Sequence, residues 1–183
     1  MKKQQGVGMM EVLVALVLLA IGVLGFAALQ LRAVDATDEA MAKVEAMNLA
    51  RDVAERIRAN RNGLGTYISN LSATTQSSTA NPECIQTTAT NPCTTATQMA
   101  NYDTAKIVSQ ANSKGMVISL LNCQVAKELD DEGKETAVDV QARHCVYVAW
   151  GETKAINSST DAQACTNGSA YLPQSKCIVM ELY

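Results

Sequence analysis

The chain has 183 residues, six of them cysteine, and a formal net charge of −3. This length gives room for one folded domain beyond a membrane helix. The small negative charge gives no electrostatic reason to expect nucleic acid as a partner. One Phe, one Trp and five Tyr also argue against a stacking platform for bases or sugars.

An uninterrupted apolar run extends from Val12 to Leu29, after a short leader that contains Lys2 and Lys3. About 20 apolar residues at about 1.5 Å each span about 30 Å, the hydrocarbon thickness of a bilayer. The apolar core of a cleaved secretory signal is shorter, about 7–15 residues. The run therefore predicts a transmembrane helix. The two lysines place its N-terminus in the cytoplasm and everything after about Leu31 outside the inner membrane.

The residues around this run carry a specific motif. Gly6-Val7-Gly8-Met9-Met10-Glu11 leads into the run, and Ile21-Gly22-Val23-Leu24-Gly25 and Leu29-Gln30 follow. A carboxylate at the membrane centre costs about 2.5–3.5 kcal/mol, and less near a helix end, so we expect Glu11 to have a partner. This N-terminal segment resembles the start of the PilV-type minor pilins, also called type IV pilus modification proteins. The alternative is an ordinary signal anchor with an incidental glutamate.

The resemblance implies a processing site and an assembly charge. Prepilins are cut after a glycine, and the fifth residue of the mature chain is a glutamate. Here this implies a leader over residues 1–6, cleavage between Gly6 and Val7, and N-methylation of Val7. It also implies that Glu11 is an assembly charge that pairs with the α-amine of an adjacent subunit, here that of Val7. Most pilins begin with Phe, whereas a start at Val7 fits the PilV-type subgroup.

The implied function is that of a minor pilin subunit in type IV pilus assembly, initiation or tip decoration. The implied partners are other minor and major pilins, the prepilin peptidase, the inner-membrane pilus assembly machinery and, before assembly, the lipid bilayer. The head is then expected in the periplasm and later on the pilus at the cell surface. Two alternatives stay open: a pseudopilin of a type II secretion system, and a DNA-binding or adhesive subunit at the pilus tip.

The sequence stays helical beyond the predicted membrane crossing. Residues 31–61 contain no Pro and no Gly and are rich in good helix formers. A single rod over residues 7–60 is predicted, about 80 Å long. Its stop signals are Asn60, Asn62, Gly63 and Gly65.

We expect the rod to have two parts, an assembly helix at 7–31 and an amphipathic continuation at 32–62, followed by a disulfide-bonded head at 63–183. Gly22 and Gly25 interrupt the first part, where each weakens the helix by about 1 kcal/mol relative to Ala. They either permit close packing against another helix or, as the resemblance implies, mark a stretch that loosens when subunits enter a filament.

The second part of the rod has an apolar face. Counting 100° per residue places six apolar residues on that face: Ala46, Met47, Ala50, Val53, Ala54 and Ile57, with Lys43 the only charge among them. The spacing predicts i,i+4 ion pairs elsewhere on the surface: Glu39 with Lys43, Arg51 with Glu55, and Asp52 with Arg56. A coiled-coil dimer is the alternative, but the apolar positions hold no sustained heptad.

The rest of the chain predicts loop, a short helix and then strands. Residues 66–98 are rich in Ser, Thr, Asn and Ala, which favours loop with at most short structured pieces, and a short helix is expected over 99–111. Strands are predicted at 116–124, 145–150 and 177–183, with a further one at 136–140. Alternation along 145–150 is typical of a half-buried strand. An antiparallel meander is expected, and with it an α+β, pilin-like fold: one long N-terminal helix packed against a small antiparallel sheet.

All six cysteines lie after the predicted membrane crossing: Cys84, Cys93, Cys123, Cys145, Cys165 and Cys177. An even number in an exported domain indicates disulfides formed in an oxidising compartment, with 15 possible pairings. Partners within one loop are the simplest solution, Cys84 with Cys93 and Cys165 with Cys177. That leaves Cys123 and Cys145 to form a bridge between two predicted strands.

No catalytic set, cofactor site or metal site is predicted. His144 stands beside Cys145, but neighbouring residues on a strand point to opposite faces, so we expect a structural histidine rather than a protease pair. The cysteines lack the C-x-x-C spacing of a zinc site. Asp130, Asp131 and Glu132 match no calcium-binding loop and are interpreted as a solvated turn.

Overall fold

A computed structural model describes residues 8–86, 90–123, 127–129, 135–137, 143–168 and 170–182. The chain divides into two compact units, residues 1–42 and 43–183, which are described separately. Several predicted features lie outside the described residues: the leader with Lys2 and Lys3, the cleavage residues Gly6 and Val7, and the acidic residues Asp130, Asp131 and Glu132.

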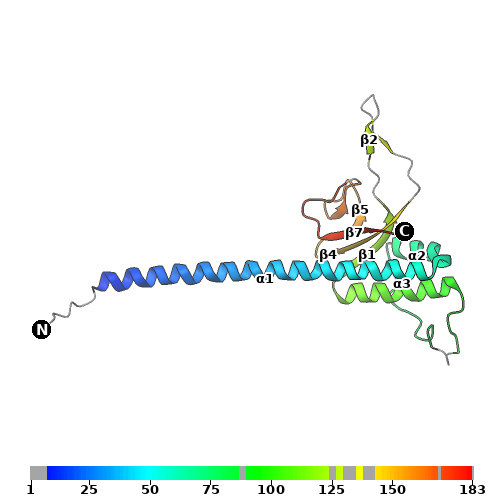
Figure 1. Ribbon diagram of the computed structural model, residues 1–183, viewed down its shortest axis with the longest axis horizontal. Helices are drawn as coiled ribbons and strands as arrows, with labels where there is room; N and C mark the ends of the chain where they lie inside the picture. Colours follow the sequence, from blue (N-terminus) through cyan, green and yellow to red (C-terminus); the bar gives the residue numbers. More distant parts are fainter. Residues whose placement is uncertain are drawn as a thin grey trace. The chain divides into compact units, whose positions relative to one another are not determined.

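Helix α1 is the longest element and extends over Met9–Ala59, close to the predicted rod (Figure 1). In the first unit it carries Glu11 in its first turn and is exposed along its whole length to residue 38. It ends where expected, because the backbone turns away at Asn60 and the short helix η1 follows over Arg61–Gly63.

In the second unit one face of α1 is buried. Its buried residues are Ala46, Leu49, Ala50, Val53, Ala54 and Ile57. The predicted face was wrong at two positions, because Met47 is 44 % exposed and Leu49 is 2 % exposed. Leu49 lies three residues after Ala46 and four before Val53, so it shares their side of the helix.

The charged surface of α1 also differs from the prediction at one pair. Asp52 does pair with Arg56, at 3.0 Å. Glu55, however, pairs with Arg58 at 2.6 Å and not with Arg51. An acid that precedes its base along a helix is favoured over the reverse order, because this order suits the helix dipole. Arg51 is therefore left without the predicted partner.

Helix α2 covers Leu64–Ser72, where the composition favoured a loop with at most short structured pieces from residue 66. The polar composition of this segment gave no signal for the position of this helix. Tyr67 and Leu71 lie four residues apart and both are fully buried, so tertiary packing outweighs the polar composition of the segment. Gly65, predicted as a stop signal, lies inside α2.

Helix α3 covers Ala96–Ser113 and starts three residues before the predicted helix. Its start is fixed by a capping box, in which Gln98 N donates to Thr95 Oγ1 at 3.2 Å and Thr95 N donates to Gln98 Oε1 at 3.1 Å. Helix α3 runs alongside α1 (Figure 1), with Lys114 paired to Glu45 at 3.0 Å.

The main sheet has three antiparallel strands in the order β1-β4-β7. Strand β1 covers Met116–Asn122, β4 covers His144–Trp150 and β7 covers Cys177–Glu181, close to three of the predicted strands. Strands β2 (Lys127–Leu129) and β3 (Glu135–Ala137) form an antiparallel pair, and β3 overlaps the predicted strand at 136–140. The pair β5 (Lys154–Asn157) and β6 (Ala164–Thr166) is parallel and was not predicted.

Strand β4 is central, and it is buried on both faces rather than on one as predicted. Cys145, Tyr147 and Ala149 pack with Ala155 and Cys165 in one cluster. The alternate residues Val146, Val148 and Trp150 point the other way and are also buried, Trp150 to 7 % exposure. A strand with neighbours on both sides and cover on both faces loses the simple alternation of apolar and polar residues.

A side chain meets each outer edge of the three-stranded sheet. On β1, the carbonyl of Ile118 accepts a hydrogen bond from Gln76 Nε2 at 2.8 Å, and the same amide donates to Leu71 O at the end of α2. On β7, Val179 N–H donates to the hydroxyl of Tyr171 at 3.0 Å.

Gly63 is required by the close approach of η1 to α3. A Cβ at this position would lie 2.7 Å from Asn60 Nδ2, 2.9 Å from Ala96 O and 3.0 Å from Ala100 Cβ. We therefore expect Gly63→Ala to lower the free energy of unfolding by about 1–3 kcal/mol through overpacking. Thermal unfolding of the full chain in detergent, followed by the fluorescence of Trp150, measures the effect.

Gly65→Ala is the matched control, because nothing lies within 4 Å of a Cβ at that position and Gly65 lies in the first turn of α2. Alanine is favoured over glycine by about 1 kcal/mol in a helix interior and by less in the first turn, so this variant should be as stable as the parent or slightly more so. Equal stability of the two variants would contradict the packing argument for Gly63.

Candidate functional site

The first part of α1 has an apolar surface on all sides. Between Val12 and Leu31 its large apolar side chains are 48–71 % exposed. Among the described residues this is the one helix long and apolar enough to cross a membrane, and no part of its most apolar window is buried. A helix that is apolar all round needs cover from lipid or from other helices.

Glu11 is the one acidic residue within this apolar surface. It lies in the first turn of α1, and its N–H donates to Gly8 O at 2.9 Å. Its position at the helix N-terminus is favourable for a carboxylate, because the helix dipole is positive there. Its carboxylate forms no hydrogen bond or ion pair within the described residues. A charge in an apolar surface without a partner in its own chain is suited to pair with a cation from outside it.

Gly22 and Gly25 have open space around them. A Cβ at either position would meet nothing within 4 Å in this chain. Packing inside the chain therefore does not require glycine at these positions. Both expectations, close helix packing and a stretch that loosens, remain predictions about contacts outside the chain.

In the head, three helices meet at a buried carboxylate. Asp103 of α3 is 6 % exposed and accepts a hydrogen bond from Arg56 Nη1 of α1 at 2.7 Å and another from the hydroxyl of Tyr67 of α2. Asn60 at the end of α1 donates to Ala96 O at 2.8 Å. This network was not predicted from the sequence. Its signal was an aspartate between the apolar residues Ala100 and Ile107, at i−3 and i+4 on one face of α3.

We expect Tyr67→Phe to reduce the loss of stability at alkaline pH. Burial, together with the hydrogen bond to Asp103, raises the pKa of Tyr67 well above its usual value. From about pH 10 upward the unfolded chain loses this proton while the folded chain keeps it, so the free energy of unfolding falls as pH rises, by up to about 1.4 kcal/mol per pH unit. Phenylalanine has no proton to lose and removes this slope.

Urea unfolding of the full chain between pH 8 and pH 11.5 measures the slope in both proteins. At neutral pH the Phe variant should be less stable by about 1–3 kcal/mol, because the carboxylate of Asp103 loses a donor. Burial also raises the pKa of Tyr147, but this contribution is common to both proteins. Identical slopes would contradict the assignment of alkaline sensitivity to Tyr67.

The six cysteines form three disulfides, Cys84–Cys93, Cys123–Cys145 and Cys165–Cys177. These are the same pairs that were predicted from the sequence, and no cysteine is free. Cys145 therefore has no thiol to offer the half-buried His144 beside it on β4. Within the described part of the chain no group of three or more His, Cys, Asp or Glu side chains could hold a metal ion.

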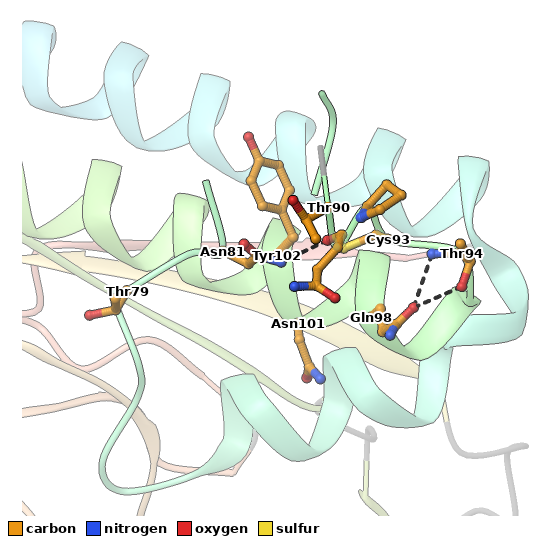
Figure 2. A pocket seen from close by; sticks show the side chains of 10 residues that line it. Thr79, Asn81, Thr90, Cys93, Thr94, Gln98, Asn101 and Tyr102 are labelled. Atoms are coloured by element: carbon orange, nitrogen blue, oxygen red, sulfur yellow. Dashed lines mark hydrogen bonds between the residues drawn. The ribbon is translucent and has the colours of Figure 1, made fainter. Parts of the chain in front are cut away.

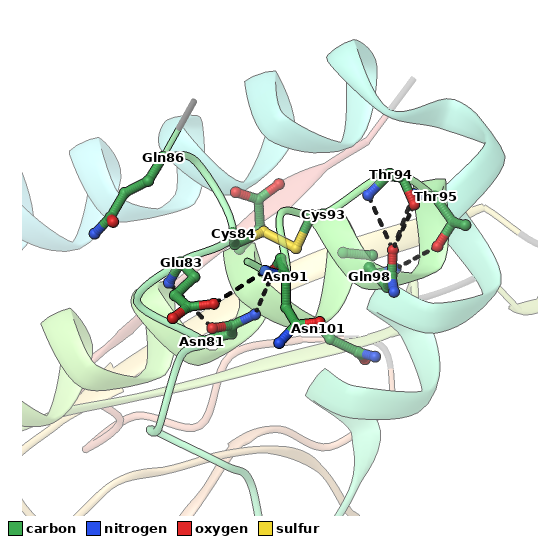
Figure 3. The surroundings of a disulfide bond; sticks show 12 residues. Asn81, Glu83, Cys84, Gln86, Asn91, Cys93, Thr94, Thr95, Gln98 and Asn101 are labelled. Carbon is green, nitrogen blue, oxygen red and sulfur yellow. Dashed lines mark hydrogen bonds between the residues drawn. A yellow bond between two sulfur atoms is a disulfide. The ribbon is translucent and has the colours of Figure 1, made fainter. Parts of the chain in front are cut away.

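The Cys84–Cys93 disulfide closes a loop that polar contacts organise (Figure 3). Glu83 is central: its N–H donates to Asn81 Oδ1 at 3.0 Å, and its carboxylate accepts from Asn91 N at 3.1 Å. Cys93 N donates to Cys84 O at 3.0 Å. The disulfide and these bonds hold a segment that has few large apolar side chains of its own.

A hollow of about 570 Å³ lies between this loop and the start of α3 (Figure 2). Its lining consists mainly of amide and hydroxyl side chains, with one disulfide sulfur and one proline, and carries no charged side chain: Thr79, Asn81, Thr90, Asn91, Pro92, Cys93, Thr94, Gln98, Asn101 and Tyr102. Gln98 Oε1 accepts hydrogen bonds from the N–H and the hydroxyl of Thr94 (Figure 2). Such a lining can exchange hydrogen bonds but cannot neutralise an ion.

Comparison with known families places these features. A family model described as type IV pilin Tt1218 matches residues 28–105, and a model of the prokaryotic N-terminal methylation motif matches residues 1–27. The chain is a type IV pilin. No curated protein and no solved structure gives a significant match. Neither family match distinguishes the PilV type from other type IV pilins.

The predicted fold of the pilin, a long N-terminal helix followed by a small antiparallel sheet, is confirmed. Type IV pilins are structural proteins, so the prediction that the chain is not an enzyme is also confirmed. Membership of the family implies association with other pilins and with the prepilin peptidase machinery. The methylation motif and the apolar part of α1 fit anchoring in a membrane and assembly into a pilus.

Proposed function

We propose that this pilin is a minor, PilV-like subunit that takes part in type IV pilus assembly, initiation or tip decoration. The observation that carries the proposal is the first part of α1, whose apolar surface and single carboxylate have no cover or partner in the described chain. Lipid satisfies the apolar surface before assembly, and the helices of other pilins satisfy both features afterwards.

In this proposal residues 1–6 are a leader, residues 7–31 insert in the membrane and then in the filament, residues 32–62 continue the helix, and residues 63–183 form the head. The peptidase cuts between Gly6 and Val7, and Val7 is then N-methylated. The match to the methylation motif over residues 1–27 supports this order.

The proposed location is the bacterial inner membrane, with the N-terminus in the cytoplasm and the head in the periplasm, and later the pilus at the cell surface. The proposed partners are minor and major pilins and the inner-membrane assembly machinery. Three disulfides in the head support an oxidising compartment. They also favour the pilus over the alternative of a type II secretion pseudopilin.

The first test of the proposal is the N-terminus of the mature chain. Mass spectrometry of the protein from cells that assemble pili should find Val7 as the first residue, with an added methyl group on its amine. The mature chain should contain 183 − 6 = 177 residues. Replacing Gly6 with a large residue should leave the leader attached. A mature start elsewhere, for example after Ala28, would contradict the processing scheme.

The second test concerns Glu11 as an assembly charge. Glu11→Gln keeps the shape of the side chain but removes the charge that would pair with the α-amine of Val7 in an adjacent subunit. Cleavage and membrane insertion should be unchanged, because they do not use this pair. The amount of the subunit in sheared pili should fall about tenfold or more, since one charge of a desolvated pair is then left alone.

Val12→Ala is the control for Glu11→Gln, because it alters a neighbouring side chain of the same apolar surface without removing a charge. It should reach pili at close to the parent level. If Glu11→Gln also enters sheared pili at the parent level, the charge pair is dispensable and the proposed role of Glu11 is wrong.

A further inference from the structure

A hollow between the second part of α1 and strand β7 has an apolar lining and one charge. It has a volume of about 410 Å³ and is lined by Met47, Arg51, Tyr171, Ile178, Val179 and Met180. Met47 and Tyr171 are 44 % and 52 % exposed, so apolar side chains on both sides of the hollow face solvent. We call this hollow the Arg51 groove.

The charge of Arg51 is not balanced within the described chain. Neighbouring acids already have basic partners: Asp52 pairs with Arg56, Glu55 with Arg58, Glu45 with Lys114 and Glu181 with Arg143. Arg51 forms no hydrogen bond or ion pair with any residue that the structure describes. A guanidinium beside exposed apolar side chains is complementary to a carboxylate that lies beside apolar side chains.

An added β-strand is a poor fit for this groove. Leu182 N donates to His144 O on β4, and Trp150 N donates to Lys176 O. The backbone N–H and C=O groups of the even-numbered residues of this segment therefore point toward β4. Val179 N–H therefore points outward, and the hydroxyl of Tyr171 already accepts its hydrogen bond at 3.0 Å. An incoming strand would have to break this bond, whereas a helix that lays side chains into the groove would not.

This chain itself carries a helix with the required chemistry. On α1, Val34, Asp38 and Met41 lie at i, i+4 and i+7 and so share one face. Val34 and Met41 are 57 % and 63 % exposed, and Asp38 forms no ion pair within the described residues. An apolar, acidic, apolar stripe of this kind matches the lining of the Arg51 groove.

We propose that the Arg51 groove docks the long helix of an adjacent pilin subunit, through a stripe in which a carboxylate lies between apolar side chains. Arg51 pairs with the carboxylate, while Met47 and Met180 pack against the apolar residues beside it. This inference rests on the proposed function in assembly and adds to it the surface of the head that receives a neighbour.

Site-directed photocrosslinking in the full chain tests the groove. A benzophenone amino acid at Met47 is incorporated in cells that assemble pili, the cells are irradiated, and the adducts in whole membranes are identified by mass spectrometry. The second peptide of the adduct should come from the N-terminal helix of a pilin and contain Asp or Glu. Arg51→Glu should lower the yield of this adduct about tenfold or more, because like charges then face each other, and Arg51→Lys should retain most of it.

Arg61→Glu is the matched control, because it makes the same change of charge at an exposed residue of η1 outside the groove. Its adduct yield should equal that of the parent. Adducts only with lipid, with the strands of a pilin head or with a protein that is not a pilin would overturn the proposal. So would an unchanged yield in Arg51→Glu.

Failure of the groove and failure of the assembly role give different results. Adducts are read in membranes, where pilins meet whether or not this subunit later enters a pilus, and sheared pili are assayed separately for the parent protein. Parent protein in pili without a helix adduct overturns the groove alone. A helix adduct without parent protein in pili supports the groove and counts against the assembly role.

Discussion

Small side chains on one face of α1 set how closely the head can approach the helix. Ala46, Ala50 and Ala54 recur every four residues and are 0–4 % exposed. Larger side chains at these positions would push the head elements away from the backbone of α1, and close packing of the interior depends on that separation. The larger residues Leu49, Val53 and Ile57 fill the space beside the alanines, so the head packs on the helix in one well-defined position.

The polar contacts in this interface between α1 and the head are buried or partly buried, unlike the ion pairs on the surface. Asp103 is buried and bonded to both Arg56 and Tyr67, so a shift of any of the three helices would leave a charge or a hydroxyl unpaired. Exposed pairs such as Glu55–Arg58 contribute little to stability. Their importance here is indirect: because Glu55 pairs with Arg58, it leaves Arg51 available for the contact proposed above with a neighbouring subunit.

Features with a strong local signal could be predicted from the sequence. The helix over 7–60 and the strands near 116–124, 145–150 and 177–183 follow from composition and periodicity, which are local. Helix α2 and the parallel pair β5–β6 could not be predicted in this way, since Tyr67 and Ala155 are buried by residues far away in the chain. The sequence did contain a signal for the start of α3, because Thr95 and Gln98 have the spacing of a capping box. For the candidate site, Glu11 was identified from a family motif, whereas the role proposed for Arg51 depends on its three-dimensional neighbours.

The two capped edges of the sheet have a consequence for the subunit while it waits in the membrane. Heads that are anchored in a bilayer share a thin layer of solution, where their local concentration is high and unpaired strand edges favour aggregation. Gln76 occupies the carbonyl of Ile118 on one edge, and Tyr171 occupies the N–H of Val179 on the other. One hydrogen-bonding group at the middle of each edge is thus already in use, which makes it harder for crowded heads to join their sheets before they are assembled.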